Sequence, residues 1–231
     1  MMSTKRLWCS SSSLRNHRAC HTALVTLLLL AGLSAMASSY FPEFYHTWNP
    51  KLGMWSSYRI TDARGETAEL TFSVVGKEVD LYWLELRTKQ EGAEGTVAFL
   101  LSGDPGDDAN VQLIRAQEPG GPALEISRST LAKLQTQGQG AFGGEATAIG
   151  PKVGKLEQLP EETVVVAGKS LKCRHLKIVA PDQTAEVWLS DDAGPLGLVK
   201  LKSGLEEVVL LACGMGAKPT LKGPFTPLAV P

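Results

Sequence analysis

Short apolar segments separated by turn residues run along the chain from residue 55 onward, and few of them show a helical period. The clearest is ELTFSVV, in which Leu70, Phe72 and Val74 alternate with polar residues. Successive side chains of a strand point to opposite faces, so this alternation predicts one face in the core and the other in water. The segment VVGKEVD predicts a tight hairpin through Gly76 and Lys77. Further strands are expected at residues 55–64, 79–88, 96–101, 111–117, 163–166, 170–179, 185–190, 197–202 and 207–213.

About ten strands, mostly joined by short turns, predict a mainly β fold, an antiparallel meander that forms an unclosed or half barrel. The segment VDLYWLEL departs from simple alternation. Val79, Leu81 and Trp83 occupy one parity, whereas Leu84 and Leu86 occupy the other. Such a strand is apolar on both faces or carries a bulge. Its second face then needs a cover, which can be a helix, a ligand or a partner.

One segment predicts a helix. SRSTLAKLQTQG begins with Ser and Thr residues suited to a helix start, carries Leu131 and Leu134 on one side, and ends at Gly138. We expect this single short helix to cover the sheet. The Gly-rich segment after it carries Phe142 and is either a surface connection or a lid.

The first 37 residues have the features of a signal peptide. They are basic without any acidic residue, and residues 23–37 form an apolar run that ends in Ala35-Met36-Ala37. Signal peptidase requires small side chains at two such positions. We therefore predict cleavage after Ala37 and export to the periplasm, with no transmembrane segment after cleavage. An uncleaved membrane anchor is the alternative, although the run is shorter than the roughly 20 residues that a spanning helix needs.

The mature chain divides into three parts. Residues 38–54 form an aromatic-rich N-terminal strap, residues 55–216 a single β domain, and residues 217–231 a Pro-rich tail. The strap either closes a cavity or offers a binding surface, or it packs against one end of the barrel as additional core.

Charge argues against two classes of partner. The leader holds four of the 23 basic residues and none of the 24 acidic ones, which leaves the mature chain with a net charge of −5. A mildly acidic chain without a Lys/Arg block has no electrostatic footprint for nucleic acid. Nor is it suited to an anionic membrane surface.

Catalytic and metal-binding motifs are missing from the sequence. The mature chain has two histidines, His46 and His175, without metal-ligand spacing, nucleophile elbow or phosphate loop. His175 and Cys173 share a strand face and could hold a metal or activate a thiolate, but a core or rim histidine is the plainer interpretation. The loop SGDPGDDAN lacks the spacing of a calcium loop and predicts a polar turn. We therefore expect neither an enzyme nor a cofactor.

The mature chain keeps two cysteines, Cys173 and Cys213. Both lie in expected strands. In an oxidising compartment they can form one disulfide. The alternative is two separate buried thiols.

The segment AEVWLSDDAGPLGLVKLKSG predicts a hairpin. Trp188 lies on the strand face opposite Val187, and Asp191 and Asp192 are solvated at the turn. If Trp188 lines a cavity it contributes to binding, and otherwise it belongs to the core. The candidate ligand-binding residues are Trp48, Trp55, Tyr58, Trp83, Phe142 and Trp188.

Three segments together carry a resemblance: PKLGMWSSYRI, VVVAGKSLKCRHLKI and AEVWLSDDAGPLGLVKLKSG. In this order they resemble a set of uncharacterised bacterial periplasmic proteins, which is similar in architecture to the lipoprotein-localisation carriers. The resemblance implies an unclosed antiparallel barrel with a helical lid over an apolar cavity. It also implies a periplasmic, non-enzymatic binding protein that carries or senses a lipid, an acyl chain or another hydrophobic ligand. The alternative is an envelope protein–protein interaction or assembly module with a filled core.

Overall fold

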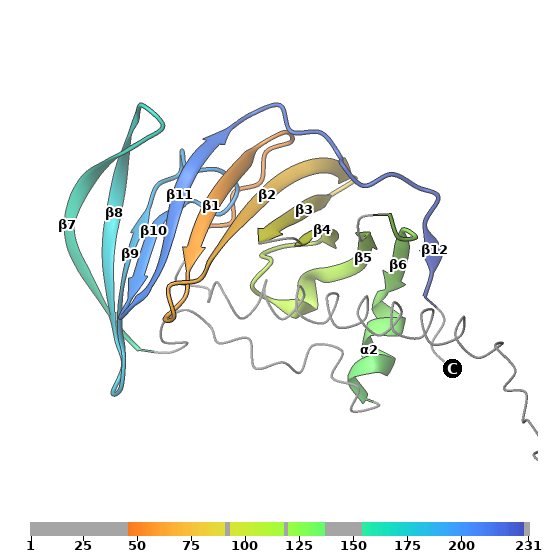
Figure 1. The fold of residues 1–231 in the computed structure, drawn as a ribbon, viewed down its shortest axis with the longest axis horizontal. Helices are drawn as coiled ribbons and strands as arrows, with labels where there is room; N and C mark the ends of the chain where they lie inside the picture. Colours follow the sequence, from red (N-terminus) through yellow and green to blue (C-terminus); the bar gives the residue numbers. More distant parts are fainter. Residues whose placement is uncertain (1–45, 91–92, 118–119, 137–153, 229–231) are drawn as a thin grey trace, which may run out of the picture.

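The computed structural model describes residues 46–90, 93–117, 120–136 and 154–228. Within these residues the chain forms one twelve-stranded sheet that curves into an open half-barrel (Figure 1). The strands are β1 (Trp55–Thr61), β2 (Thr67–Glu78), β3 (Leu81–Gln90), β4 (Ala93–Leu101), β5 (Val111–Gln117), β6 (Leu124–Ser127), β7 (Lys155–Val166), β8 (Lys169–Val179), β9 (Thr184–Leu189), β10 (Leu198–Ser203), β11 (Glu206–Gly214) and β12 (Thr226–Pro227). The predicted fold class, a mainly β, unclosed antiparallel meander with one short helix, is confirmed.

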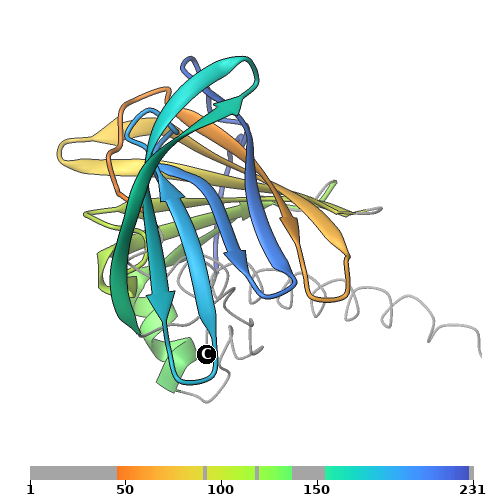
Figure 2. The same cartoon turned by 90° about the vertical axis from the view of Figure 1, so that its left-hand side faces the viewer.

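The strand order shows how the two halves of the meander meet. It runs β12-β6-β5-β4-β3-β2-β1-β11-β10-β9-β8-β7, so β1 pairs with β11 in the middle of the sheet. Figure 2 shows this second half of the meander from β11 to β7 facing the viewer. All neighbouring strands are antiparallel except β12 and β6, which are parallel. The β1–β11 pairing is therefore the long-range contact on which the sheet depends.

The turn between β2 and β3 differs from its prediction. The chain reverses at residues 79–80, where Val79 has a φ of +55°, and not at Gly76 and Lys77. Gly76 lies inside β2 at a register irregularity, opposite Trp83. A Cβ on Gly76 would lie 3.1 Å from Cδ1 of Trp83. The glycine is thus explained by close packing of an aromatic ring and not by a turn.

The inner, concave face carries the main core. Leu70, Phe72 and Val74 are at most 4% exposed, which confirms the predicted alternation. Directly opposed residues of antiparallel strands share a face. The register therefore continues this face across the β1–β11 pairing, through Ile60 opposite Val208. Side chains of β3 to β6 and of β8 to β10 join the same cluster.

The outer face carries a second, smaller cluster formed by Trp83, Ala98 and Leu100. Its cover is the C-terminal segment, residues 215–228, which crosses the convex side of the sheet from β11 to β12 (Figure 1). Leu221 of this segment packs against the cluster. Of the two alternatives considered for β3, the structure shows the strand with apolar side chains on both faces, and the C-terminal segment of the same chain covers the outer one.

A single α-helix is present in the described residues, α2 (Arg128–Thr136), at nearly the predicted position. The hydroxyl of Ser127 accepts a hydrogen bond from the backbone N–H of Thr130 (3.2 Å) and so satisfies one of the donors at the helix start. Leu131 packs against the inner core, and Figure 1 places the helix beneath β5 and β6. No helix in this part of the chain is long and apolar enough to cross a membrane.

Candidate functional site

Residues 46–50 of the N-terminal strap lie between two loops at one end of the half-barrel. Nε2 of His46 is 2.8 Å from Oδ1 of Asp104 in the β4–β5 loop. The next residue, Thr47, donates its backbone N–H to the carbonyl of Leu196 in the β9–β10 loop (2.7 Å). Because consecutive Cα atoms are only about 3.8 Å apart, the two loops approach each other closely with the strap between them. The strap therefore connects the two halves of the sheet.

Further contacts fix the same strap. The N–H of Asn49 donates to the carbonyl of Pro195 (3.2 Å), and Arg174 on β8 donates to the hydroxyl of Thr47 (3.2 Å). Trp48 is half-buried and packs against the inner core. The described residues of the strap thus close one end of the half-barrel while adding to its core.

In the contact between His46 and Asp104 the histidine is buried and the aspartate is partly exposed. His46 is 6% exposed, and Asp104 also accepts a hydrogen bond from the N–H of Gly106 (2.7 Å). Burial raises the pKa of Asp104, but the hydrogen bond and charge of His46 together with the Gly106 N–H outweigh it, so the pKa lies below its ordinary value. Within the described residues Nδ1 of His46 has no hydrogen-bond partner. The ionised carboxylate is therefore the form that holds the strap.

The interior behind the strap is lined by apolar side chains and by Tyr58. This tyrosine is fully buried, and its hydroxyl reaches past β11 to donate to the carbonyl of Leu198 on β10 (3.1 Å). Its ring meets Phe72 edge to face at 5.9 Å. Burial raises the pKa of Tyr58 well above its ordinary range. Among the described residues, Leu84 and Leu86 are each 1% exposed, so these side chains are covered in this structure.

The six candidate ligand-binding residues do not share one site. Tyr58 faces the interior, and Trp48 packs against the inner core. Trp55 is opposite Ser73, and Trp83 belongs to the outer cluster, so both lie on the outer face. Trp188 is opposite Lys200 and therefore lies on the outer side of β9, but it is buried and belongs to the main core cluster. Phe142 lies outside the described residues.

Trp188 belongs to a polar cluster on β7 to β9. Its ring stacks on His175 with centroids 4.2 Å apart, and its indole N–H donates to Glu162 (2.9 Å). Nδ1 of His175 is 3.1 Å from Glu162, and Nε2 is 3.2 Å from Glu186. Both ring nitrogens of His175 therefore already have partners. The predicted placement of Trp188 on the face opposite Val187 is confirmed by the register.

The two cysteines are free thiols in the structure. Cys173 lies on β8 and Cys213 on β11, with β9 and β10 between them in the sheet. The structure thus has two separate thiols in place of the considered disulfide. Burial raises the pKa of both thiols above its ordinary value, which disfavours the reactive thiolate. The described residues contain no group of three His, Cys, Asp or Glu side chains that could hold a metal ion.

Comparison with known proteins finds similarity in structure only. No family model matches the sequence, and no curated protein matches it either. Among solved structures, MucB in complex with MucA(peri) has 16% identity and a TM-score of 0.42 over 85% of this chain and 59% of that chain. MucB in the Pseudomonas aeruginosa MucA/MucB complex has 15% identity and a TM-score of 0.39, over 84% and 57% of the two chains. The chain thus spans less than two thirds of the MucB structures.

A third similar structure is a protein from Bacteroides fragilis with a YmcC-like fold. It has 12% identity and a TM-score of 0.31, and the match covers 74% of this chain and 99% of that chain. These similarities are remote.

Two groups of residues escaped sequence reasoning. His46 and Asp104 are 58 positions apart, and each taken alone predicts only an isolated histidine and a turn. Glu85 and the C-terminal segment are 135 positions apart. The one available signal was the unusual apolar content of both faces of β3, which required a cover without identifying it.

Proposed function

We propose that the protein is an exported, non-enzymatic binding module of the bacterial periplasm whose interior holds the apolar part of a lipid, such as an acyl chain. The strap, hydrogen-bonded to loops from both halves of the sheet, is the observation that carries this proposal. It lies where a ligand would enter the end of the half-barrel. The continuous apolar inner face supplies the surface that an acyl chain requires.

The interior side chains are covered, so a ligand enters only when the strap or another cover moves. Residues 46–50 of the strap are held by few hydrogen bonds, and each bond stabilises the closed position by about 0.5–1.5 kcal/mol net. Burying one methylene group contributes about 0.8 kcal/mol. An acyl chain of about ten carbons therefore gains about 8 kcal/mol, which is of the same order as the cost of breaking these bonds and exposing Trp48.

Lipid occupancy tests this proposal directly. Native mass spectrometry of protein purified from the periplasm should show lipid adducts, and delipidated protein should take up a fluorescent fatty acid. Asp104→Asn should speed release of the fatty acid because it weakens the contact with His46. Asp107→Asn is the matched control, since Asp107 lies in the same loop but caps a 3₁₀ turn by accepting from Ala109.

Absence of both lipid adducts and fatty-acid uptake would contradict the proposal. Equal release rates in Asp104→Asn and in the wild type would leave lipid binding in place but remove the strap from its mechanism. The two readouts therefore test the ligand and the gate separately.

The open edge of the sheet supports a second candidate function, the docking of an envelope protein. Strand β7 is the last strand of the sheet. Its middle carries Pro160 beside a register irregularity, and such features protect edges from unwanted pairing. Its end, residues 163–166, has no proline or charge, and Val165 is 68% exposed. An extended peptide of the partner could add a strand here.

A pull-down from periplasmic extract separates the two functions. Val165→Lys should abolish capture of a protein while leaving fatty-acid uptake intact. Asp104→Asn should speed release of the fatty acid while leaving capture of the protein intact. Leu205→Lys is the matched control, because Leu205 is also exposed but lies in the turn between β10 and β11, away from the edge strand. If Val165→Lys and the wild type capture the same proteins, the edge is not the docking surface.

A further inference from the structure

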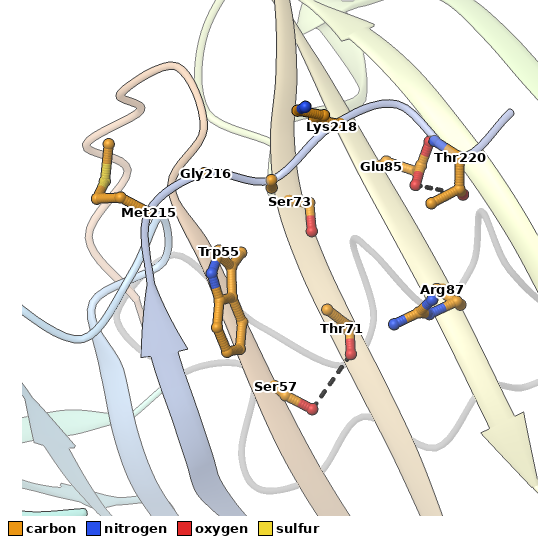
Figure 3. A pocket seen from close by; sticks show the side chains of 11 residues that line it. Trp55, Ser57, Thr71, Ser73, Glu85, Arg87, Met215, Gly216, Lys218 and Thr220 are labelled. Carbon is orange, nitrogen blue, oxygen red and sulfur yellow. Dashed lines mark hydrogen bonds between the residues drawn. The ribbon is translucent and has the colours of Figure 1, made fainter. Parts of the chain in front are cut away.

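A groove on the outer face of the sheet lies between the C-terminal segment and strands β1 to β3 (Figure 3). Its volume is about 360 Å³. The register places its side chains in rows across the strands, with Trp55 opposite Ser73, and with Ser57 opposite Thr71, which is itself opposite Arg87. Directly opposed side chains of antiparallel strands lie about 4.5–5.5 Å apart. The rows therefore form one continuous surface.

The indole ring of Trp55 forms an apolar part of this surface. It lies against the backbone of β11, where a Cβ on Gly214 would be 3.0 Å from Nε1 and 3.2 Å from Cε2 of the ring. Any larger residue at position 214 would require the ring to shift by a few tenths of an ångström. A flat apolar ring beside hydroxyl groups suits a sugar, which offers a C–H face for packing and hydroxyls for hydrogen bonds.

The hydroxyl groups of the groove are arranged for a polar ligand. Thr71 donates its hydroxyl to Ser57 (3.1 Å), so the hydroxyl hydrogen of Ser57 remains for a ligand. Ser73 and Trp55 are opposite each other and form the row next to that of Ser57 and Thr71. These groups can donate to, and accept from, the hydroxyls of a sugar ring.

Two basic side chains line the groove, and the carboxylate of Glu85, which also lines it, offsets part of their positive charge. Arg87 and Lys218 are exposed, and neither makes a side-chain hydrogen bond or ion pair within the described part of the chain. The nearby carboxylate of Glu85 is already used, because it is 3% exposed and accepts hydrogen bonds from Thr220 and Leu221. An acidic group of a ligand would therefore be attracted to the Arg87 side of the groove.

We propose that this groove binds an acidic sugar, with the sugar ring on Trp55 and its carboxylate or phosphate on Arg87 and Lys218. The planar guanidinium of Arg87 can donate two parallel hydrogen bonds to either acid group. Lys218 adds a second positive charge from the C-terminal segment, opposite Arg87 across the groove (Figure 3). This site is separate from the interior and does not depend on lipid binding.

A nuclear magnetic resonance titration tests the proposal with four probes: sodium glucuronate, glucose 6-phosphate, glucose and sodium acetate. The indole N–H signal of Trp55, assigned with Trp55→Phe, should shift saturably with the two acidic sugars. Glucose and acetate should bind more weakly because each provides one half of the recognised chemistry. Arg87→Gln should weaken glucuronate binding by about ten- to hundredfold, the effect of losing charge-assisted hydrogen bonds.

Arg59→Gln is the matched control, because Arg59 is exposed on the same face of β1 but does not line the groove. It should bind glucuronate as the wild type does. Lys218→Gln repeats the test on a residue outside the sheet, so a folding defect at Arg87 cannot imitate the result. Unchanged affinity in both Arg87→Gln and Lys218→Gln would overturn the proposal. Equal affinity for acetate and glucuronate would do the same, since it would mean that an anion alone is recognised.

Discussion

One of the groups that hold the C-terminal segment to the outer face is the buried carboxylate of Glu85. Glu85 accepts hydrogen bonds from the backbone N–H of Thr220 (2.9 Å), from its hydroxyl (2.6 Å) and from the N–H of Leu221 (3.3 Å). Figure 3 shows the hydroxyl contact. Glu85→Gln keeps the size of the side chain but replaces one accepting oxygen with an NH₂ group. It therefore tests whether this segment is part of the stable fold.

The expected loss of stability follows from these contacts. Removing a buried hydrogen bond to a charged group costs about 1.5–3 kcal/mol. The Gln oxygen can keep both backbone bonds, and its NH₂ group can donate to the Thr220 hydroxyl, so Glu85→Gln loses mainly the charge on the acceptor and should lower the free energy of unfolding by about 1–3 kcal/mol. Thr220→Val removes only the hydroxyl bond and should cost about 1.5–3 kcal/mol. Because the two residues are in contact, the double variant should lose less than the sum by about 1–2 kcal/mol.

Urea unfolding followed by circular dichroism measures these free energies, and amide hydrogen exchange at Thr220 and Leu221 reports local release of the segment. Thr226→Val is the matched control, because Thr226 lies in the same segment and pairs with β6 through its backbone. It should stay within about 0.5 kcal/mol of the wild type. A Glu85→Gln variant as stable as the wild type, with unchanged exchange at Leu221, would refute the reasoning.

Two further predictions concern pH. The pKa of Asp104 is below its ordinary value of 3.8. The contribution of Asp104 to stability is therefore present above that value and is lost as pH falls through the folded-state pKa. Asp104→Asn lacks the charged contact with His46, so its stability should depend less on pH in this acid range than that of the wild type. The pKa of Tyr58 is raised by burial, so the unfolded chain releases this proton first and stability should fall as pH rises above about 10. Tyr58→Phe should reduce that loss of stability at alkaline pH. At neutral pH it should lower the free energy of unfolding by about 1–3 kcal/mol, because the carbonyl of Leu198 loses its donor. Thermal melts across pH measure both effects.

Local pattern was sufficient to predict most strands because alternation depends only on neighbouring residues. Leu70, Phe72 and Val74 turned out to be buried as expected. The turn after β2 was misplaced for a physical reason: glycine serves both turns and close packing. Gly76 makes room for Trp83, whereas the turn itself places Val79 at positive φ, a conformation that valine rarely adopts.

Long-range pairing could not be predicted from alternation. A strand's pattern identifies which face is apolar but not which strand lies beside it, so nothing local indicates that β1 pairs with β11. The position of the C-terminal segment is even harder to predict from the sequence. Residues 215–225 have no strand or helix period, and they gain a fixed position only through contacts such as those of Glu85 and the packing of Leu221 on the outer cluster.

The two proposed sites lie on opposite faces of one sheet, and this makes them separable. Strand β1 directs Tyr58 into the interior and Trp55 and Ser57 into the groove, because alternate side chains of a strand face opposite sides. Arg87→Gln should therefore leave fatty-acid uptake unchanged, and Asp104→Asn should leave glucuronate affinity unchanged. If glucuronate altered fatty-acid affinity in the wild type, fatty acid would have to alter glucuronate affinity by the same factor. Reciprocal effects of this kind would contradict independent sites and would instead require a conformational change of the sheet shared by both faces.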